Sequence, residues 1–223
     1  MSQLGRQTWP EAADGPRLLL IPLGSCEQHG PHLPLDTDTR IAAAVADDAA
    51  RRRPDLVVAP ALAYGASGEH ADFAGTLSIG LAAVEQVVVE LVRSADHFRG
   101  VVLVNGHGGN AHAVNRAVRT LQAEGRAALA WFPHLPGSDA HAGRTETSIV
   151  LAIAPDLVHL DRAEAGNPTP LSDLLPALES GGVRAVSANG VLGDPAGASA
   201  GEGRRLLEVL ATDLITTLAA WAV

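Results

Sequence analysis

The sequence predicts an α/β fold built around a mostly parallel sheet. Between residues 17 and 132, short runs of apolar residues recur, and such runs are typical of strands that are buried on both faces. Each run is followed by a polar loop or by a segment with helical spacing of its apolar residues. Regular alternation of buried strands and helices is characteristic of layered folds in which helices cover the sheet.

Four segments have the composition of buried strands. The first, RLLLIPL, is nearly continuous in apolar residues and is followed by Gly24, which favours a turn. The third, VVLV, is followed at once by NGHGGN, so that polar residues begin where the strand ends. The four predicted strands occupy residues 17–23, 55–60, 101–104 and 127–132.

The predicted helices are marked by their apolar spacing and by the residues that end them. The segment TDTRIAAAVADDAARRR starts with capping residue types, continues in alanine and stops at Pro54, which cannot continue a helix. The next helix repeats apolar residues at three- and four-residue spacing from Leu81 to Leu91. After the third strand, an Ala/Val/Arg-rich segment is predicted to be a helix that Gly125 ends.

The last third of the chain has weaker patterns. A short helix is predicted for ETSIVLAIA, residues 146–154, and a long helix with apolar periodicity for residues 203–223. Between them, GGVRAVSANGVLGDP at residues 181–195 is interpreted as a strand and a turn.

Length and composition limit the function classes. A chain of 223 residues, of which 47% are hydrophobic, buries one core, so we expect a single domain over residues 1–223. The net charge of −9 disfavours binding to nucleic acid. No apolar run approaches the roughly 18–20 residues that span a bilayer, and the N-terminal residues lack the pattern of a secretion signal. We therefore expect a cytoplasmic protein with no membrane partner.

The single cysteine, Cys26, excludes an internal disulfide and a cysteine-based zinc cluster. A bound metal would have to be held by carboxylates and by some of the nine histidines. Cys26 itself also has a possible interpretation as a nucleophile activated by a neighbouring imidazole, although a thiol that follows an apolar strand is more commonly inert.

Three polar loops follow predicted strands and concentrate histidine and acidic residues. They are GSCEQHGPHLPLDTD at residues 24–38, NGHGGN at residues 105–110 and DAHAGRTETS at residues 139–148. Because loops at the carboxyl ends of parallel strands converge at one edge of the sheet, we expect these three loops to form one site. His32, His97, His112 and His159 lie outside the patterns that point to this site.

The residue types in these loops predict a metal centre. Zinc and ferrous iron bind imidazole nitrogen and carboxylate oxygen, usually with four to six ligands including water. Four such ligands are Glu27, His29, Asp38 and His107, and Glu146 makes a fifth. Five ligands suffice for two ions if Asp38 bridges them, and water held by such ions becomes nucleophilic at neutral pH. Hydrolysis is the expected reaction.

Each of these residues also has an ordinary structural interpretation. Asp38 has the residue type of a helix cap, Glu27 and His29 have the spacing of a surface pair, and a histidine among glycines is usually a solvated loop residue. The convergence of all three loops at one edge favours the metal centre over these alternatives. Glu69 and His70, in a long loop, are candidate substrate contacts, with an ordinary exposed pair as the alternative. Trp131, at a strand end, is a further candidate substrate contact, although core packing is the more common role of such a residue.

The chain resembles the creatininase family of metal-dependent amide hydrolases. The similarity is carried by GSCEQHGPHLPLDTD, YGASGEHADFAGTLS, VNGHGGN and HAGRTETS, in this order over most of the first 150 residues. Further on, GNPTPLSDLLPALESGGVRAVSANGVLGDPAGASAGEGRR is similar to the branch of that family associated with mycofactocin biosynthesis. The resemblance implies a three-layer α/β/α sandwich, assembled into a homo-oligomer, with metal ions at the strand ends.

The resemblance also implies residue roles. It places metal ligands on Glu27, His29, Asp38 and His107, with Asp38 as the bridge. Creatininase itself carries a glutamate where this chain has Gly109, and that glutamate completes its second metal site. In this chain Glu146 is the candidate replacement, either as ligand or as proton donor, and His141 resembles the histidine of the family that moves protons or orients the substrate.

The implied reaction is hydrolysis of the modified mycofactocin precursor peptide near its C-terminus, which releases a Val-Tyr-derived unit. The implied cofactor is one or two divalent ions per subunit, Fe²⁺ or Zn²⁺, with Mn²⁺ also compatible with the ligands. His141 or Glu146 would protonate the leaving amine. Two alternatives stay open: hydrolysis of a small cyclic amide or formamide at the same site, and a metal-bound scaffold protein without turnover.

Overall fold

A computed structural model of the chain, which describes residues 3–13, 15 and 17–221, contains a four-stranded parallel sheet. Its strands lie in the order β2-β1-β3-β4, and each adjacent pair is parallel. In register, Leu20 of β1 lies opposite Val58 of β2 and Val102 of β3. The strands are β1 (Leu18–Leu23), β2 (Leu56–Val58), β3 (Gly100–Asn105) and β4 (Ala128–Trp131).

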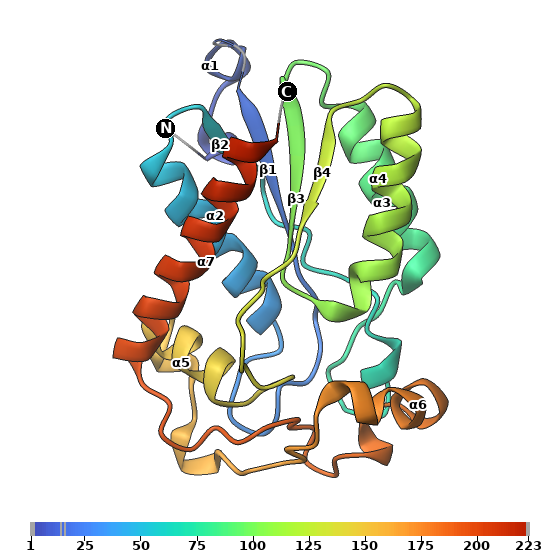
Figure 1. Cartoon of the computed structure of the whole chain (residues 1–223), viewed down its shortest axis with the longest axis vertical. Helices are drawn as coiled ribbons and strands as arrows, with labels where there is room; N and C mark the ends of the chain where they lie inside the picture. Colours follow the sequence, from blue (N-terminus) through green and yellow to red (C-terminus); the bar gives the residue numbers. More distant parts are fainter. Residues whose placement is uncertain (1–2, 14, 16, 222–223) are drawn as a thin grey trace.

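Helices cover both faces of the sheet, which confirms the predicted three-layer α/β/α arrangement (Figure 1). One face is covered by α2 (Thr37–Arg52), α5 (Arg144–Ile153) and α7 (Ala200–Ala220). The other is covered by α3 (Gly80–Arg93) and α4 (Ala111–Ala123). Because both faces of the sheet are covered, every residue of β1 and β3 is buried, and this explains why their sequences are continuous rather than alternating in apolar residues.

Shorter elements complete the described chain. Two further helices are α1 (Trp9–Ala12) and α6 (Leu171–Gly181). Single 3-10 turns lie at Leu4–Arg6, Gly68–His70, Gly108–Asn110, Pro155–Leu157, Leu160–Arg162 and Val183–Ala185. The C-terminal helix begins three residues earlier than predicted, and residues 222–223 of its predicted range lie outside the described residues.

The strand predicted within residues 181–195 is wrong. This segment contains the 3-10 turn Val183–Ala185, and its extended part makes one isolated bridge, between His141 and Leu192. Gly182 and Gly190 have φ values of +67° and +81°, which reverse the chain direction where a strand would continue. Residues 181–195 therefore act as a loop that packs against the loop before α5.

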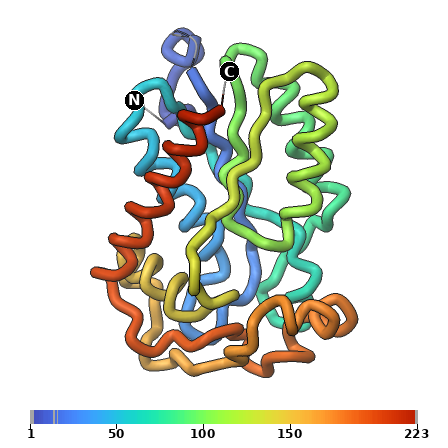
Figure 2. The backbone as a smooth tube through the Cα atoms, viewed as in Figure 1, coloured from blue at the N-terminus to red at the C-terminus, as the bar shows by residue number. Residues whose placement is uncertain are grey.

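The carboxyl ends of all four strands point toward one end of the molecule, where the loops, α5 and α6 gather (Figure 1). The segment from residue 160 to residue 198 crosses this end, as the smooth trace in Figure 2 shows. The polar loops after β1, β3 and β4 meet there, as expected of a parallel α/β sheet. Among the described residues, no helix has the length and apolar content that crossing a bilayer requires.

Candidate metal centre

The five predicted ligands converge beyond the carboxyl end of the sheet. Glu27 and His29 lie in the loop after β1, Asp38 in the first turn of α2, His107 directly after β3 and Glu146 in the first turn of α5. They form two groups of three, Glu27–Asp38–His107 and His29–Asp38–Glu146. In each group, one possible ligand atom from every residue lies within 4.8 Å of the others. Asp38 belongs to both groups.

Asp38 faces a different histidine with each carboxylate oxygen. Its Oδ1 lies 2.9 Å from His29 Nε2 and its Oδ2 lies 3.0 Å from His107 Nδ1, and Oδ2 also accepts a hydrogen bond of 2.8 Å from Ser25 Oγ. The start of α2 shows no side-chain capping bond. Asp38 is 3% exposed, and its carboxylate connects the two histidines rather than capping the helix.

Backbone carbonyls fix the orientation of both histidines. His29 Nδ1 lies 3.1 Å from the carbonyl oxygen of Glu27, and His107 Nε2 lies 3.0 Å from that of Ala66. Because a carbonyl oxygen only accepts, each of these nitrogens carries a proton and donates it. The other nitrogen of each ring therefore faces Asp38. This is the arrangement by which proteins orient metal-binding histidines.

Glu27 provides an independent test of whether the site fits a cation. The residue is 1% exposed, and among the described residues neither of its carboxylate oxygens has a hydrogen-bond partner. The nitrogens His107 Nε2 and His70 Nε2 approach these oxygens at 3.2 and 3.3 Å without the geometry of a hydrogen bond. A buried carboxylate without donors is costly unless a cation lies beside it. The residues present thus fit a divalent ion.

When no ion is bound, the charges of the carboxylates and histidines at the site shift one another's pKa values. Burial disfavours the imidazolium of His29, but the Asp38, Glu146 and Glu27 carboxylates outweigh burial and raise the pKa of His29 to about 10. In His107, burial is likewise outweighed, chiefly by Glu27 and Asp38, and its pKa is raised well above the usual value. Burial also opposes ionisation of Asp38, yet the two histidines hold its pKa well below normal. Protons thus occupy the positions between imidazole and carboxylate that a metal ion would take.

Glu146 is the third member of the group that contains His29 and Asp38. Its Oε2 lies 3.9 Å from His29 Nε2 and accepts a hydrogen bond of 2.6 Å from the backbone N–H of Ala142. Ala142 has a φ of +54°, a conformation that a residue with a side chain rarely adopts, and this turn aims the start of α5 at the centre. Burial, followed by the charge of Asp38, raises the pKa of Glu146 to about 7.

Two more histidines lie beside Glu27. His141 Nδ1 lies 4.0 Å and His70 Nε2 lies 3.3 Å from Glu27 Oε1. Burial lowers the pKa of His70 to about 4, and burial together with the charge of His29 lowers that of His141 to about 3. Both imidazoles are therefore neutral near pH 7.

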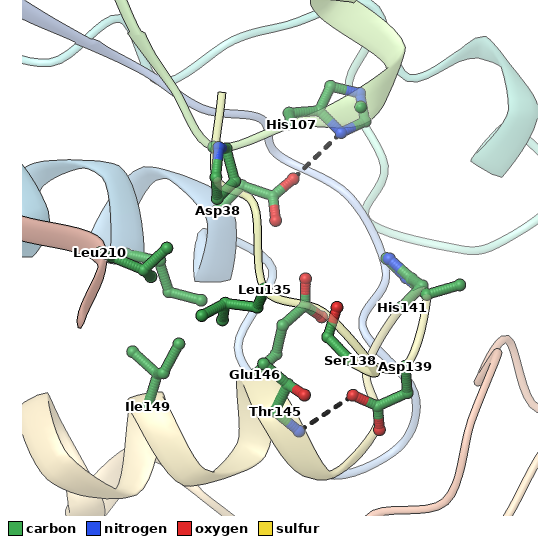
Figure 3. Close-up of a pocket in the computed structure, with 15 residues that line it drawn as sticks. Asp38, His107, Leu135, Ser138, Asp139, His141, Thr145, Glu146, Ile149 and Leu210 are labelled. Carbon is green, nitrogen blue, oxygen red and sulfur yellow. Dashed lines mark hydrogen bonds and ion pairs between the residues drawn. The ribbon is translucent and has the colours of Figure 1, made fainter. Parts of the chain in front are cut away.

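A pocket of about 220 Å³ opens onto the centre, and Figure 3 shows Asp38, His107, His141 and Glu146 around it. Its other wall includes Leu135, Ile149 and Leu210. A second hollow of about 520 Å³ adjoins it and shares the loop at residues 135–139. The centre is thus open to a ligand from one side.

The three predicted substrate contacts have different positions. His70 and Glu69 lie beside the centre, where Glu69 Oε1 is 3.7 Å from His107 Nε2. Trp131 is 4% exposed and packs in the core on the α7 face of the sheet, where its Nε1 donates a hydrogen bond of 2.7 Å to Asp213. The structure brings Glu69 and His70 to the centre and leaves Trp131 in the core.

Two residues of this region were not predicted. His32 is fully buried, and its Nε2 lies 2.9 Å from Thr147 Oγ1, the residue after Glu146. Gln28 is 5% exposed and contacts both His70 and His141. For Gln28, the one signal in the sequence is its position between Glu27 and His29. The contact between His32 and Thr147 spans 115 positions, so it leaves no local pattern in the sequence.

Comparisons with known proteins place the chain among amide hydrolases. The family profile described as creatininase, creatinine amidohydrolase, matches residues 5–218. The mycofactocin precursor peptide peptidase of Mycobacterium ulcerans (strain Agy99) is 52% identical over 223 residues, which cover 96% of this chain and 86% of that protein.

Two solved creatininase structures are similar over the whole chain. A structure described as creatininase with Mn is 28% identical, covers 97% of both chains and has a TM-score of 0.80. The Zn-Zn form of the E122Q mutant creatininase is 28% identical, covers 97% of this chain and 96% of that one, and has a TM-score of 0.79.

Proposed function

The chain belongs to the creatininase family, and from this premise we propose that it is a metal-dependent hydrolase that cleaves the mycofactocin precursor peptide near its C-terminus. The product is a Val-Tyr-derived unit. The observation that carries the chemistry is that Asp38 belongs to two groups of possible ligands, of which every member but the half-buried Glu146 is buried. The substrate follows from the 52% identity to a peptidase named for this peptide, whereas identity to the creatininase structures is 28%.

We infer that the centre would hold two divalent ions, with Asp38 contributing to both groups of ligands. One ion would be held by Glu27, Asp38 and His107, and the other by His29, Asp38 and Glu146. Imidazole and carboxylate ligands suit Fe²⁺, Zn²⁺ and Mn²⁺ alike. Such ions lower the pKa of a water molecule in the site and offset the negative charge that develops on the scissile carbonyl oxygen.

The chain's own residues move the protons of the reaction. His141, whose Nδ1 lies 4.0 Å from Glu27 Oε1 beside the centre, takes a proton from the attacking water as the water oxygen bonds to the scissile carbonyl carbon. When the C–N bond breaks, His141 returns that proton to the leaving amine nitrogen, which releases a new amine and a new carboxylate. Glu146, whose pKa is raised to about 7, is the second group able to donate this proton.

The substrate peptide would occupy the pocket beside the centre and continue into the adjoining hollow. The two hollows share the 135–139 loop, so an extended segment would pass from one to the other without leaving the surface. Glu69 and His70, which lie beside Glu27 and His107, stay our candidates for contact with the part of the peptide nearest the scissile bond.

The remaining expectations concern the assembled protein. We infer a homo-oligomer, supported by four exposed apolar side chains on the loop before α3 and at the start of that helix: Tyr64, Leu77, Ile79 and Leu81. Light scattering coupled to size-exclusion chromatography measures the oligomer. A cytoplasmic location stays a prediction of the sequence.

The function is tested by incubating the purified protein, loaded separately with Fe²⁺, Zn²⁺ or Mn²⁺, with the modified precursor peptide, the unmodified peptide and creatinine. We expect mass spectrometry to find cleavage near the C-terminus of the modified peptide. Turnover of creatinine but not of the peptide would assign the site to small cyclic amides. Absence of any product despite bound metal would identify a scaffold protein.

A further inference from the structure

The side chain of Gln28 lies between His70 and His141 and contacts backbone groups on both sides. Its Oε1 accepts a bond of 2.9 Å from the backbone N–H of Gly30, and its Nε2 lies 3.0 Å from the carbonyl oxygen of Gly190. The same Nε2 lies 2.8 Å from His70 Nδ1 and 3.1 Å from His141 Nε2. The backbone carbonyl of Gln28 lies 2.8 Å from His141 Nε2.

Two backbone groups fix the orientation of the amide. The N–H of Gly30 can only donate, and the carbonyl of Gly190 can only accept. If the amide were flipped, its oxygen would face the Gly190 carbonyl oxygen and its NH₂ group would face the Gly30 N–H, so neither hydrogen bond could form. Gly190 has a φ of +81°, and a Cβ built on it would overlap Gln28 Oε1. The loop at residues 187–192 therefore closes tightly over the amide.

The backbone carbonyl of Gln28 determines which nitrogen of His141 carries its proton. The carbonyl oxygen of Gln28 accepts, so His141 Nε2 must donate to it. His141 Nε2 then has no lone pair for the amide of Gln28, and the 3.1 Å contact between these two nitrogens is not a hydrogen bond. In the neutral ring, the lone pair is left on Nδ1, which lies 4.0 Å from Glu27 Oε1 at the centre.

The two amide hydrogens then go to the two acceptors that remain, the Gly190 carbonyl and His70 Nδ1. His70 Nδ1 is an acceptor, so the proton of this ring is on Nε2, which lies 3.3 Å from Glu27 Oε1. An imidazolium at His70 would place two donors against each other at 2.8 Å, so the network itself selects the neutral ring.

We propose that Gln28 is a positioning residue that gives the two histidines opposite roles at the centre: His70 presents an N–H donor at Nε2, and His141 presents an acceptor at Nδ1. This inference rests on the proposed hydrolysis. The N–H of His70 is then available to a substrate oxygen, and His70 is not a metal ligand through Nε2. His141 is the one of the pair that can take the proton of the attacking water.

The test is a direct measurement of the tautomers. Long-range ¹H–¹⁵N correlation spectra of the Zn²⁺-loaded protein, labelled with ¹⁵N in the histidine rings and assigned with H70N and H141N variants, distinguish a proton on Nδ1 from one on Nε2. We expect both His70 and His141 to carry it on Nε2. A proton on Nδ1 in either ring overturns the proposal, and this outcome requires no variant of Gln28 to fold.

Gln28→Glu is the matched perturbation, because a carboxylate keeps the acceptor for Gly30 and removes the donor to His70. We expect the proton of His70 to move to Nδ1 while His141, held by the backbone carbonyl, does not change. We expect kcat for peptide cleavage to fall about 10- to 100-fold with zinc content retained, the loss typical of an outer partner of a metal site. Unchanged tautomers and an unchanged kcat in Q28E would overturn the proposal.

Gln122→Glu is the control, because Gln122 also donates its amide to a backbone carbonyl, that of Ala128, but lies at the opposite end of the sheet. We expect neither histidine spectrum nor kcat to change in Q122E. The two claims fail separately: wild-type protein that cleaves the peptide with the wrong tautomers removes this inference alone, whereas correct tautomers without cleavage remove the proposed function.

Discussion

Glu69 occupies the space that a side chain at Gly109 would need. A Cβ built on Gly109 would lie 2.5 Å from Glu69 Oε1, and it would also overlap the carbonyl oxygen of Ala66 and His107 Nε2. A side chain at position 109 and Glu69 in its observed position therefore exclude each other. In this chain a carboxylate reaches the same region from the loop at residues 61–78 rather than from the segment after β3.

We predict that Gly109→Ala weakens metal binding. The added methyl group would overlap the Ala66 carbonyl oxygen and His107 Nε2, so we expect the His107 ring to shift from its position beside Asp38. A zinc titration against a competing chelator should show a loss of affinity of about 10- to 100-fold, comparable to the loss of an outer partner. Gly108→Ala is the control, since its Cβ would meet open space. Equal zinc affinity in both variants would contradict the prediction.

The shared position of Asp38 predicts different metal contents for two substitutions. Glu146→Gln removes a ligand from one group, and we expect bound zinc to fall from two ions per chain to one. Asp38→Asn weakens both groups, and we expect a chain that retains neither ion after dialysis. Native mass spectrometry counts the ions directly.

Glu85→Gln serves as the control for these substitutions, because Glu85 pairs with Arg116 on the surface. It should retain two ions. A wild-type chain with one ion would contradict the two-ion centre, and an E146Q variant that still holds two ions would show that Glu146 is not a ligand. In that case its raised pKa would fit the alternative role of proton donor.

Metal affinity should rise with pH. Without metal, the pKa of His29 is raised to about 10 and that of His107 lies well above its usual value, so both rings are protonated at pH 7 and must lose a proton to bind an ion. We expect zinc affinity to increase up to about pH 10, by about tenfold per pH unit for each proton displaced. Below about pH 7, protonation of Glu146 steepens the dependence.

Isothermal calorimetry of zinc binding in two buffers with different ionisation enthalpies measures these protons. Binding heats at pH 7 should differ between the buffers by an amount that corresponds to proton release. Identical heats in both buffers would mean that the ligand histidines are already neutral, and the proposed competition between protons and metal would be wrong.

The sequence predicted the layered core because burial leaves a strong local signal there. β1 and β3 are covered on both faces, and their apolar runs have no polar positions that would suggest another structure. Helix α6 was missed because Pro176 lies inside it and prolines also precede it, which is normally the pattern of a loop. The segment at residues 181–195 shows that β-branched residues among glycines do not make a strand when they pair with no strand of the sheet.

At the site, the sequence was informative where residue type alone decides the chemistry. Glu27, His29, Asp38 and His107 have few alternative roles once their loops leave the same edge of the sheet. Gln28 and His32 could not be predicted, because their roles depend on contacts with Gly190 and Thr147, which lie more than 100 positions away. Such contacts are set by tertiary packing and leave no periodic or local pattern.

Trp131 separates the two interpretations of a tryptophan at a strand end. Because its ring is buried in the core and donates to Asp213, we expect Trp131→Phe to lower the free energy of unfolding by about 1.5–3 kcal/mol, the typical value of a hydrogen bond to a charged group. KM for the peptide should not change. Urea denaturation and steady-state kinetics measure the two quantities.

Trp9→Phe is the control, since that ring is 83% exposed and its loss should change stability by less than about 0.5 kcal/mol. A raised KM with wild-type stability in W131F would instead make Trp131 a substrate contact, which would require the loop at residues 133–141 to move away from the ring when the peptide binds.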